Sequence, residues 1–196
     1  MNDIKDEFLY WMNRGYCKSP FVLQHILKVL DFAERAHRWQ WRKYSHEPYV
    51  NHPIRVAYKV WKRGLRSEEI ICAALLHDVI EDCGITVGTL KGLFGIGVSH
   101  LVDEVSNKFD DPKYGNRYNR KELELLRLSG VSDNAKAIKL ADMLDNLPCI
   151  MKNDSKFGDI YFKEKKRLFD AIKGVEQNRY LEAEVDHMFK ELNGEK

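Results

Sequence analysis

Apolar residues recur along the chain at the three- and four-residue spacing of helices, and convincing strand-like alternation is absent from the pattern. Serine or threonine before these runs, proline at their first position and glycine after them mark the expected helix ends. The expected helices span about 20–40, 52–63, 67–84, 86–94, 98–108, 117–129, 134–147, 159–173 and 178–192. The pattern predicts an all-α fold, a compact multi-helix bundle in which most helices contact a common core.

Composition narrows the class of protein. The chain has 196 residues, 44% of them hydrophobic and 32% charged, and we expect one domain over residues 1–196. Lysine and arginine total 32 against 30 acidic residues, so the net charge is +2 and we expect no general binding to DNA or to anionic membranes. The sequence shows no apolar run long enough to span a bilayer and no features of a secretory signal at its start, which favours a cytoplasmic protein.

The cysteines do not indicate a disulfide framework. The four are Cys17, Cys72, Cys83 and Cys149, and they form no CxxC pair. We expect all four to be reduced thiols and not zinc ligands.

Polar residues that could bind a metal ion follow the apolar run IICAALL in the helix expected over 67–84. His77 and Asp78 come first, and Glu81 and Asp82 follow each of them by four residues, so a continuous helix would align all four. Carboxylates near the end of a helix oppose its dipole, each at a cost of roughly 0.3–1 kcal/mol, and a divalent cation would offset that repulsion. Imidazole and carboxylate groups are ligands that such an ion accepts.

Further ligands have to come from other helices, because two side chains cannot complete a coordination sphere. His52 begins an expected helix, and Asp142 lies in the mostly apolar segment AIKLADMLDNL, where an unpaired carboxylate would be costly to bury. The two acids after the His-Asp pair would then act as acid and base on a metal-activated water. The alternative is that His52 caps a helix and that the acidic residues lie on solvated surfaces.

Four segments resemble, in the same order, the successive motifs of HD-domain alarmone hydrolases, the hydrolase module of Rel/SpoT enzymes and its small stand-alone relatives. They are AHRWQWRKYSHEPYVNHPIRVA, AALLHDVIEDCGIT, LFGIGVSHLVDEVSNK and IKLADMLDNL. The motifs span about residues 33–147, within a matched core of about 19–150. The resemblance implies a helical HD-domain fold, a bound Mn²⁺ or another divalent transition metal, and removal of the 3′-pyrophosphate from ppGpp or pppGpp.

The resemblance also implies roles for single residues. The implied metal ligands are His52, His77, Asp78 and Asp142. The residues that would serve the attacking water are Glu81 and Asp82. The positions that the family places against the nucleotide are Arg42, Lys43 and Asn146. A second phosphate-facing cluster would contain Arg117, Arg120 and Lys121, for which a solvated face is the alternative.

Several positions depart from the family pattern near the expected nucleotide side. Trp39 stands where a glycine is usual, the loop RKYSHEPY replaces a shorter glycine-containing loop, and Met143 and Asp145 alter the ADRxHN motif. None of these changes removes an implied ligand or acid. They leave open another substrate, such as an adenine alarmone, a dinucleotide phosphate or a nucleoside monophosphate, or a non-catalytic nucleotide-binding module. Aromatic residues outside the matched segments could support a homo-oligomer.

Overall fold

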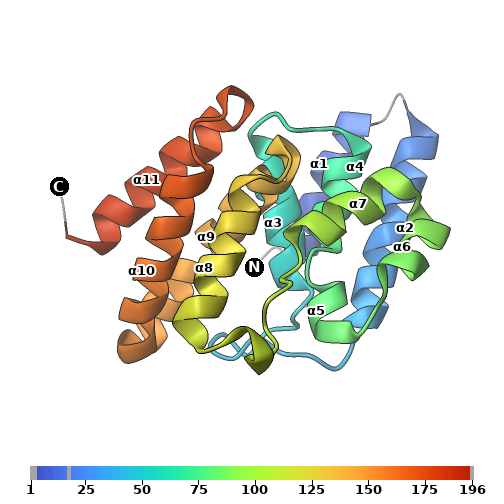
Figure 1. Ribbon diagram of the computed structural model, residues 1–196. Helices are drawn as coiled ribbons and strands as arrows, with labels where there is room; N and C mark the ends of the chain where they lie inside the picture. The colour runs from blue at the N-terminus through green and yellow to red at the C-terminus, as the bar shows by residue number, and fades with distance from the viewer. Residues whose placement is uncertain (1–3, 17–18, 195–196) are drawn as a thin grey trace. The chain divides into compact units, whose positions relative to one another are not determined.

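A computed structural model describes residues 4–16 and 19–194 of the chain. The chain divides into two compact units, residues 1–103 and 104–196. Both consist of helices, drawn blue to green in unit 1 and yellow-green to red in unit 2 (Figure 1). The described residues contain no strand, only an isolated antiparallel bridge between Trp41 and Pro48. The prediction of an all-α fold is therefore confirmed, and a single domain over 1–196 stays a prediction.

Unit 1 is organised around an apolar central helix. Its helices are α1 (Ile4–Tyr16), α2 (Pro20–Ala36), α3 (Asn51–Lys62), α4 (Glu68–Leu75), α5 (Val79–Cys83), α6 (Val87–Phe94) and α7 (Ile96–Val105), the last ending in unit 2. Helix α4 packs against α2 and α3, and α1 packs against the same two helices. Because every residue from Ile70 to Leu75 is buried, α4 forms the centre of this core.

Several helix ends follow the signals in the sequence. The Ser67 hydroxyl accepts a hydrogen bond from the Ile70 amide at 3.4 Å, and the Thr86 hydroxyl accepts one from the Thr89 amide at 3.1 Å. Helix α5 ends at Gly84, whose φ of +66° is a left-handed conformation that glycine adopts without a Cβ clash. Ser67 and Gly84 therefore fix the start of α4 and the end of α5, the two helices on either side of the turn.

The continuous helix expected over 67–84 is wrong, because the chain turns at residues 76–78 between α4 and α5. His77 Nδ1 donates a hydrogen bond to the Ala74 carbonyl at 2.8 Å. In a continuous helix the Asp78 amide would bond that carbonyl. The side-chain donor competes with the backbone donor. The His-Asp pair thus lies at a corner between two helices and not along one helix face.

The residues of unit 2 that the structure describes form four long helices and two short 3-10 turns. Its elements are η1 (Pro112–Tyr114), α8 (Arg117–Ser129), α9 (Asp133–Asn153), α10 (Ser155–Ile172), η2 (Glu176–Asn178) and α11 (Arg179–Leu192). Helix α9 packs against α10 and α11, and α10 also packs against α8. Helix α9 continues past Pro148, beyond the end that the sequence indicates. Packing against two neighbours supports α9 where the proline removes a backbone donor.

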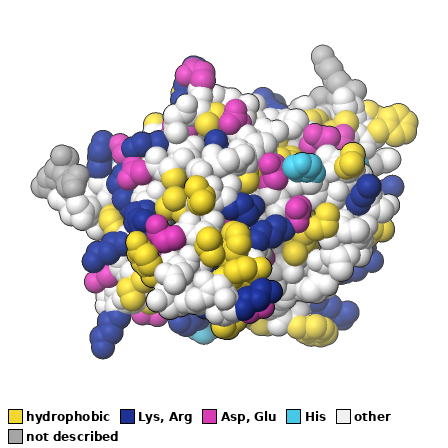
Figure 2. Space-filling view, in the orientation of Figure 1, with side chains coloured by type: hydrophobic (Ala, Val, Ile, Leu, Met, Phe, Trp, Pro, Cys, Tyr) yellow, Lys and Arg dark blue, Asp and Glu magenta, His cyan; other side chains and the backbone are white. Residues whose placement is uncertain are grey.

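The charges on the surface and the state of the cysteines match what the composition predicts. Figure 2 shows cationic and acidic side chains interspersed over the face in view, as expected for a net charge of +2. Within the described part of the chain, no helix combines the length and apolar character needed to cross a bilayer. Cys72, Cys83 and Cys149 are free thiols, and Cys17 lies outside the described residues.

Candidate metal centre

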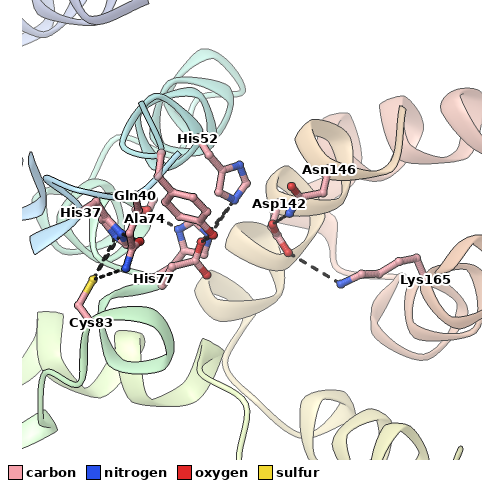
Figure 3. Close-up of polar contacts among 11 residues, drawn as sticks. His37, Gln40, His52, Ala74, His77, Cys83, Asp142, Asn146 and Lys165 are labelled. Carbon is pink, nitrogen blue, oxygen red and sulfur yellow. Dashed lines mark hydrogen bonds and ion pairs between the residues drawn. The ribbon is translucent and has the colours of Figure 1, made fainter. Parts of the chain in front are cut away.

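Three side chains with metal-ligating atoms converge in unit 1 (Figure 3). His52 Nε2 lies 3.2 Å from His77 Nε2. Asp78 Oδ2 lies 3.1 Å from His77 Nε2 and 3.5 Å from His52 Nε2. Both imidazoles are buried, whereas 16% of the Asp78 side chain is exposed. The structure thus brings together three of the four ligands that the sequence predicts, and we call these three residues the triad.

The fold sets the orientation of the two imidazoles. His52 lies in the first turn of α3, and His77 lies in the corner between α4 and α5. The Ala74 carbonyl can only accept a hydrogen bond, so His77 Nδ1 carries the hydrogen and the Nε2 lone pair faces the other members of the triad. Metal-bound histidines usually donate their second ring N–H to a carbonyl or carboxylate in this way. His77 is therefore prepared to bind through Nε2.

The spacing of the donor atoms fits a divalent transition metal. Atoms that bind one ion at about 2.1 Å lie about 3.0–3.4 Å apart at octahedral or tetrahedral angles. The three separations in the triad run from 3.1 to 3.5 Å. Two imidazole nitrogens and one carboxylate oxygen suit a divalent transition metal better than Mg²⁺ or Ca²⁺, which prefer oxygen ligands alone. The described residues of unit 1 can therefore hold such an ion.

Tyr49 lies between the triad and one of the acids that follow it. Its hydroxyl donates a hydrogen bond to Asp78 Oδ2 at 2.8 Å, and the negative charge of Asp82 also acts on it. Burial raises the pKa of Tyr49, and the negative charges of Asp78 and Asp82 raise it further. Tyr49 is accordingly a neutral hydrogen-bond donor at physiological pH.

Glu81 and Asp82 lie on α5, just after the His-Asp corner, and both are open to solvent. The pKa of Asp82 is raised above its ordinary value, because neighbouring protein desolvates its carboxylate and Asp78 adds a second negative charge. The neighbouring Tyr49 hydroxyl opposes this rise. A carboxyl group with a raised pKa holds a proton more readily, which suits it to proton transfer near neutral pH.

The two basic residues predicted to contact a nucleotide lie in the loop between α2 and α3. The Arg42 guanidinium carbon lies 5.8 Å from the centre of the Tyr49 ring, so this cation is close to the residue that holds Asp78. Lys43 is exposed, and its ammonium group lies 4.7 Å from the centre of the Tyr44 ring. Arg42 is thus the better placed of the two cations relative to the triad.

Asp142 and Asn146 form a pair on α9 in unit 2. Asn146 Nδ2 donates a hydrogen bond to Asp142 Oδ1 at 2.5 Å, and Lys165 Nζ on α10 lies 3.9 Å from Asp142 Oδ2 (Figure 3). The buried Asp142 carboxylate is therefore oriented from both sides within its own unit. The four-residue spacing places Asn146 against this carboxylate, as expected on one helix face. Membership of Asp142 in the metal site stays a prediction.

The second basic cluster predicted from the sequence lies at the start of α8. Arg120 Nη1 donates a hydrogen bond to the Gly115 carbonyl at 3.0 Å and so supports the preceding loop. Arg117 forms two hydrogen bonds with Glu164, at 2.7 and 2.8 Å. The pKa of Lys121 is lowered, chiefly by burial and further by nearby cations of α8 and α10. A role of Arg120 in substrate binding stays a prediction.

Sequence reasoning missed a set of residues that supports the triad. Tyr49 stacks on His37 with ring centres 4.9 Å apart, and His37 Nδ1 donates to Gln40 Oε1 at 2.6 Å. Gln40 Nε2 in turn donates to the Asp82 carbonyl at 2.8 Å. All three residues belong to the segments AHRWQ and EPY, and Tyr49 precedes His52 by one turn. That spacing was the signal that could have identified Tyr49 as a neighbour of the metal ligands.

Comparisons with known proteins agree with this geometry. The HD-domain family model matches residues 29–171, a range that includes all four predicted ligands. The guanosine-3′,5′-bis(diphosphate) 3′-pyrophosphohydrolase MESH1 of Drosophila melanogaster is 36% identical over 173 residues, 85% of this chain and 93% of that protein. MESH1 of Homo sapiens shows the same identity and the same two coverages.

A solved structure gives the same result. It is described by the statement that a metazoan ortholog of SpoT hydrolyzes ppGpp and plays a role in starvation responses, and it matches with a TM-score of 0.77. Identity is 34%, and the match covers 85% of this chain and 94% of the other. The similarity inferred from the sequence motifs is thereby confirmed. The chain belongs to the HD-domain family and, within it, to the group that contains the MESH1 proteins.

Proposed function

We propose that this protein hydrolyses the 3′-pyrophosphate of ppGpp or pppGpp, giving GDP or GTP and pyrophosphate. The observation that carries the proposal is the convergence of the His52, His77 and Asp78 donor atoms within 4.8 Å of one another. The relatives that are 36% identical bear the name of this activity and align over most of both chains. A substrate of this kind also favours a cytoplasmic site of action.

The metal ion that we propose is Mn²⁺, held by the triad together with Asp142. When bound, a divalent ion acts as a Lewis acid toward phosphoryl oxygens and lowers the pKa of water. The chain supplies the surroundings that such an ion requires. The Ala74 carbonyl fixes the ring orientation of His77, and Asn146 orients the Asp142 carboxylate.

Glu81 and Asp82 would carry the protons of the reaction. Water attacks the phosphorus attached to the 3′ oxygen, a new P–O bond forms, and the bond from that phosphorus to the 3′ oxygen breaks. One of the two carboxyl groups takes the proton of the attacking water, and a proton returns to the 3′ oxygen as it leaves. The raised pKa of Asp82 favours its role as the proton donor.

The substrate carries several negative charges, which cations of the chain would neutralise. We propose that Arg42 and Lys43 bind the nucleotide and that Asn146 and Arg120 contact it from unit 2. A planar guanidinium can bind phosphate oxygens bidentately or stack on a base. Arg42 lies beside the Tyr49 ring in the same unit as the triad, which supports the assignment for that residue most directly.

The test is a hydrolysis assay with ppGpp and Mn²⁺ on the wild-type protein and two variants. Asp78→Ala removes a ligand, so we expect loss of bound metal and of activity. Glu81→Gln keeps the size of the side chain but not its basicity, so we expect metal to stay bound while turnover falls about 10²–10⁴-fold. Metal analysis of both variants accompanies the assay. Full activity of Glu81→Gln would remove the role assigned to Glu81.

A different nucleotide substrate is the second candidate, because Trp39 replaces the glycine usual in the family. Trp39 is 80% exposed. Met143, another of the departures, is fully buried and packs in the core. A panel of guanine and adenine nucleotides with Mn²⁺ decides between the two, and product analysis separates release of pyrophosphate from release of orthophosphate. Binding without turnover under every divalent ion would instead indicate a non-catalytic module.

A further inference from the structure

The Tyr49 hydroxyl contacts the same oxygen of Asp78 that faces the imidazoles. Asp78 Oδ2 accepts the hydrogen bond from Tyr49 at 2.8 Å and lies 3.1 Å from His77 Nε2. A carboxylate oxygen has two lone pairs, so Oδ2 can accept from Tyr49 and still face the centre of the triad. The negative charges of Asp78 and Asp82 both act on this hydroxyl. One side chain therefore contacts a metal ligand and lies close to an acid assigned to proton transfer.

The ring of Tyr49 is itself held in place on two sides. It stacks on His37 with centres 4.9 Å apart and an angle of 29° between the planes. It also meets His52 edge to face, with centres 5.9 Å apart and an angle of 75°. The Tyr49 amide donates a hydrogen bond to the Gln40 carbonyl at 3.0 Å, which joins the two sides of the loop between α2 and α3. These contacts leave the hydroxyl little freedom to move away from Asp78.

Asp78 requires such support more than the two histidines do. Both imidazoles are buried, whereas the Asp78 side chain is partly exposed and follows the corner between α4 and α5. A partly exposed carboxylate can rotate its oxygens, and rotation would remove Oδ2 from the triad. The hydrogen bond from a ring that is packed on two sides prevents this rotation.

We infer that Tyr49 is a positioning residue of the metal centre, which aims Asp78 Oδ2 at the two imidazoles. The inference rests on the metal site of the proposed function. It assigns no chemistry to Tyr49 itself, which acts through Asp78. Its consequence is that loss of one hydroxyl weakens metal binding without loss of any ligand.

The test compares Tyr49→Phe with a matched control, Tyr58→Phe. Tyr58 lies on α3 in the same unit, and its hydroxyl donates a hydrogen bond to Glu7 Oε1 at 2.7 Å. Both substitutions remove one phenol-to-carboxylate hydrogen bond and keep the ring. Calorimetric titration with Mn²⁺ should show about 10–100-fold weaker binding in Tyr49→Phe, the range typical for partners of metal ligands, and wild-type affinity in Tyr58→Phe.

Two further measurements separate positioning from a general effect on folding. Co²⁺ substitution gives a visible absorption spectrum that reports ligand geometry, and we expect a changed spectrum only in Tyr49→Phe. Thermal unfolding without metal should give similar midpoints for the two variants. At saturating Mn²⁺ we expect kcat for ppGpp to stay below the wild-type value in Tyr49→Phe with KM unchanged, since the Asp78 carboxylate has lost the hydrogen bond that orients it.

The outcomes are distinct. Wild-type Mn²⁺ affinity and an unaltered Co²⁺ spectrum in Tyr49→Phe would overturn the inference, as would an equal loss of affinity in both variants. A wild-type protein that binds no Mn²⁺ would overturn the metal site and the inference with it. A wild-type protein that binds Mn²⁺ without hydrolysing ppGpp would contradict only the proposed reaction, and the affinities of the two variants would still decide the role of Tyr49.

Discussion

Glu47 shows how one carboxylate holds the loop that leads to His52. Arg55 on α3 donates to both of its oxygens, from Nη1 to Oε2 at 3.0 Å and from Nη2 to Oε1 at 2.7 Å. Asn51 and Ser45 donate to the same carboxylate at 3.1 and 2.9 Å. A bidentate pair of this kind fixes geometry better than a single contact. Glu47 thereby anchors the loop that contains Arg42 and Lys43 to α3, the helix that contains His52.

This arrangement predicts an acid-sensitive contribution to stability. The hydrogen bonds from Arg55, opposed by partial burial, lower the pKa of Glu47 from 4.5 to about 2. A lowered pKa in the folded state stabilises the protein above the unfolded value, and this stabilisation is lost as the pH falls from about 4.5 toward 2. We expect Glu47→Gln to lower the free energy of unfolding at pH 7 by about 1 kcal/mol, since water screens the partly exposed pair.

Urea unfolding of the wild type and Glu47→Gln between pH 7 and pH 3 measures this difference. The difference in the free energy of unfolding between the two proteins should become smaller as the pH falls below about 4.5. Glu176→Gln is the control, because Glu176 pairs with Arg179 on an exposed surface and such pairs contribute little. A gap for Glu47→Gln that does not change with pH would contradict the assigned ionic role.

At the scale of the helix, N-cap residues differ in how much they stabilise the fold. The Thr86 hydroxyl caps α6 through the Thr89 amide at 3.1 Å. The Ser19 side chain precedes α2 at the equivalent position but forms no capping hydrogen bond. We expect Thr86→Ala to cost about 1 kcal/mol, or about 2–4 °C in Tm for a chain of this length. We expect Ser19→Ala to lower the free energy of unfolding by only a few tenths of that amount. Calorimetry measures both variants, and equal decreases in Tm would contradict the difference between the two caps.

The same elements show what a sequence can predict and what it leaves out. Helix starts at Pro20, Ser67 and Thr86 depend on neighbouring residues, so local signals identify them. The break at His77 depends on a side-chain hydrogen bond to Ala74, which competes with the helix only in the folded corner. Periodicity alone therefore predicted one helix where the structure has two.

Tertiary contacts account for the other differences. Helix α1 was not predicted, although Phe8 and Met12 are fully buried, because thirteen residues with few strong signals become helical by packing on α2 and α3. The residue types of the triad were predictable from ligand chemistry. The spacing of Tyr49 to His52 could indicate that Tyr49 lies near the ligands, but its hydrogen bond to Asp78 depends on the folded loop and not on a local signal.

At the scale of the whole molecule, the predicted ligands are distributed over both units. The triad belongs to residues 1–103 and Asp142 to residues 104–196. The family match over 29–171 includes both sets. If Asp142 binds the same ion as the triad, the free energy of metal binding stabilises both units and not unit 1 alone.

Hydrogen exchange with and without Mn²⁺ tests this coupling. We expect Mn²⁺ to slow exchange of amides on α9 around Asp142 as well as those on α3 around His52, because opening of either helix would release a ligand. A metal concentration of 100 Kd should stabilise the protein by about 2.7 kcal/mol. Asp142→Asn should lower Mn²⁺ affinity at least about 10-fold and abolish the protection of α9, whereas Asp145→Asn on the same helix should do neither. Protection confined to α3 in the wild type, or full affinity in Asp142→Asn, would show that the triad binds its ion without Asp142.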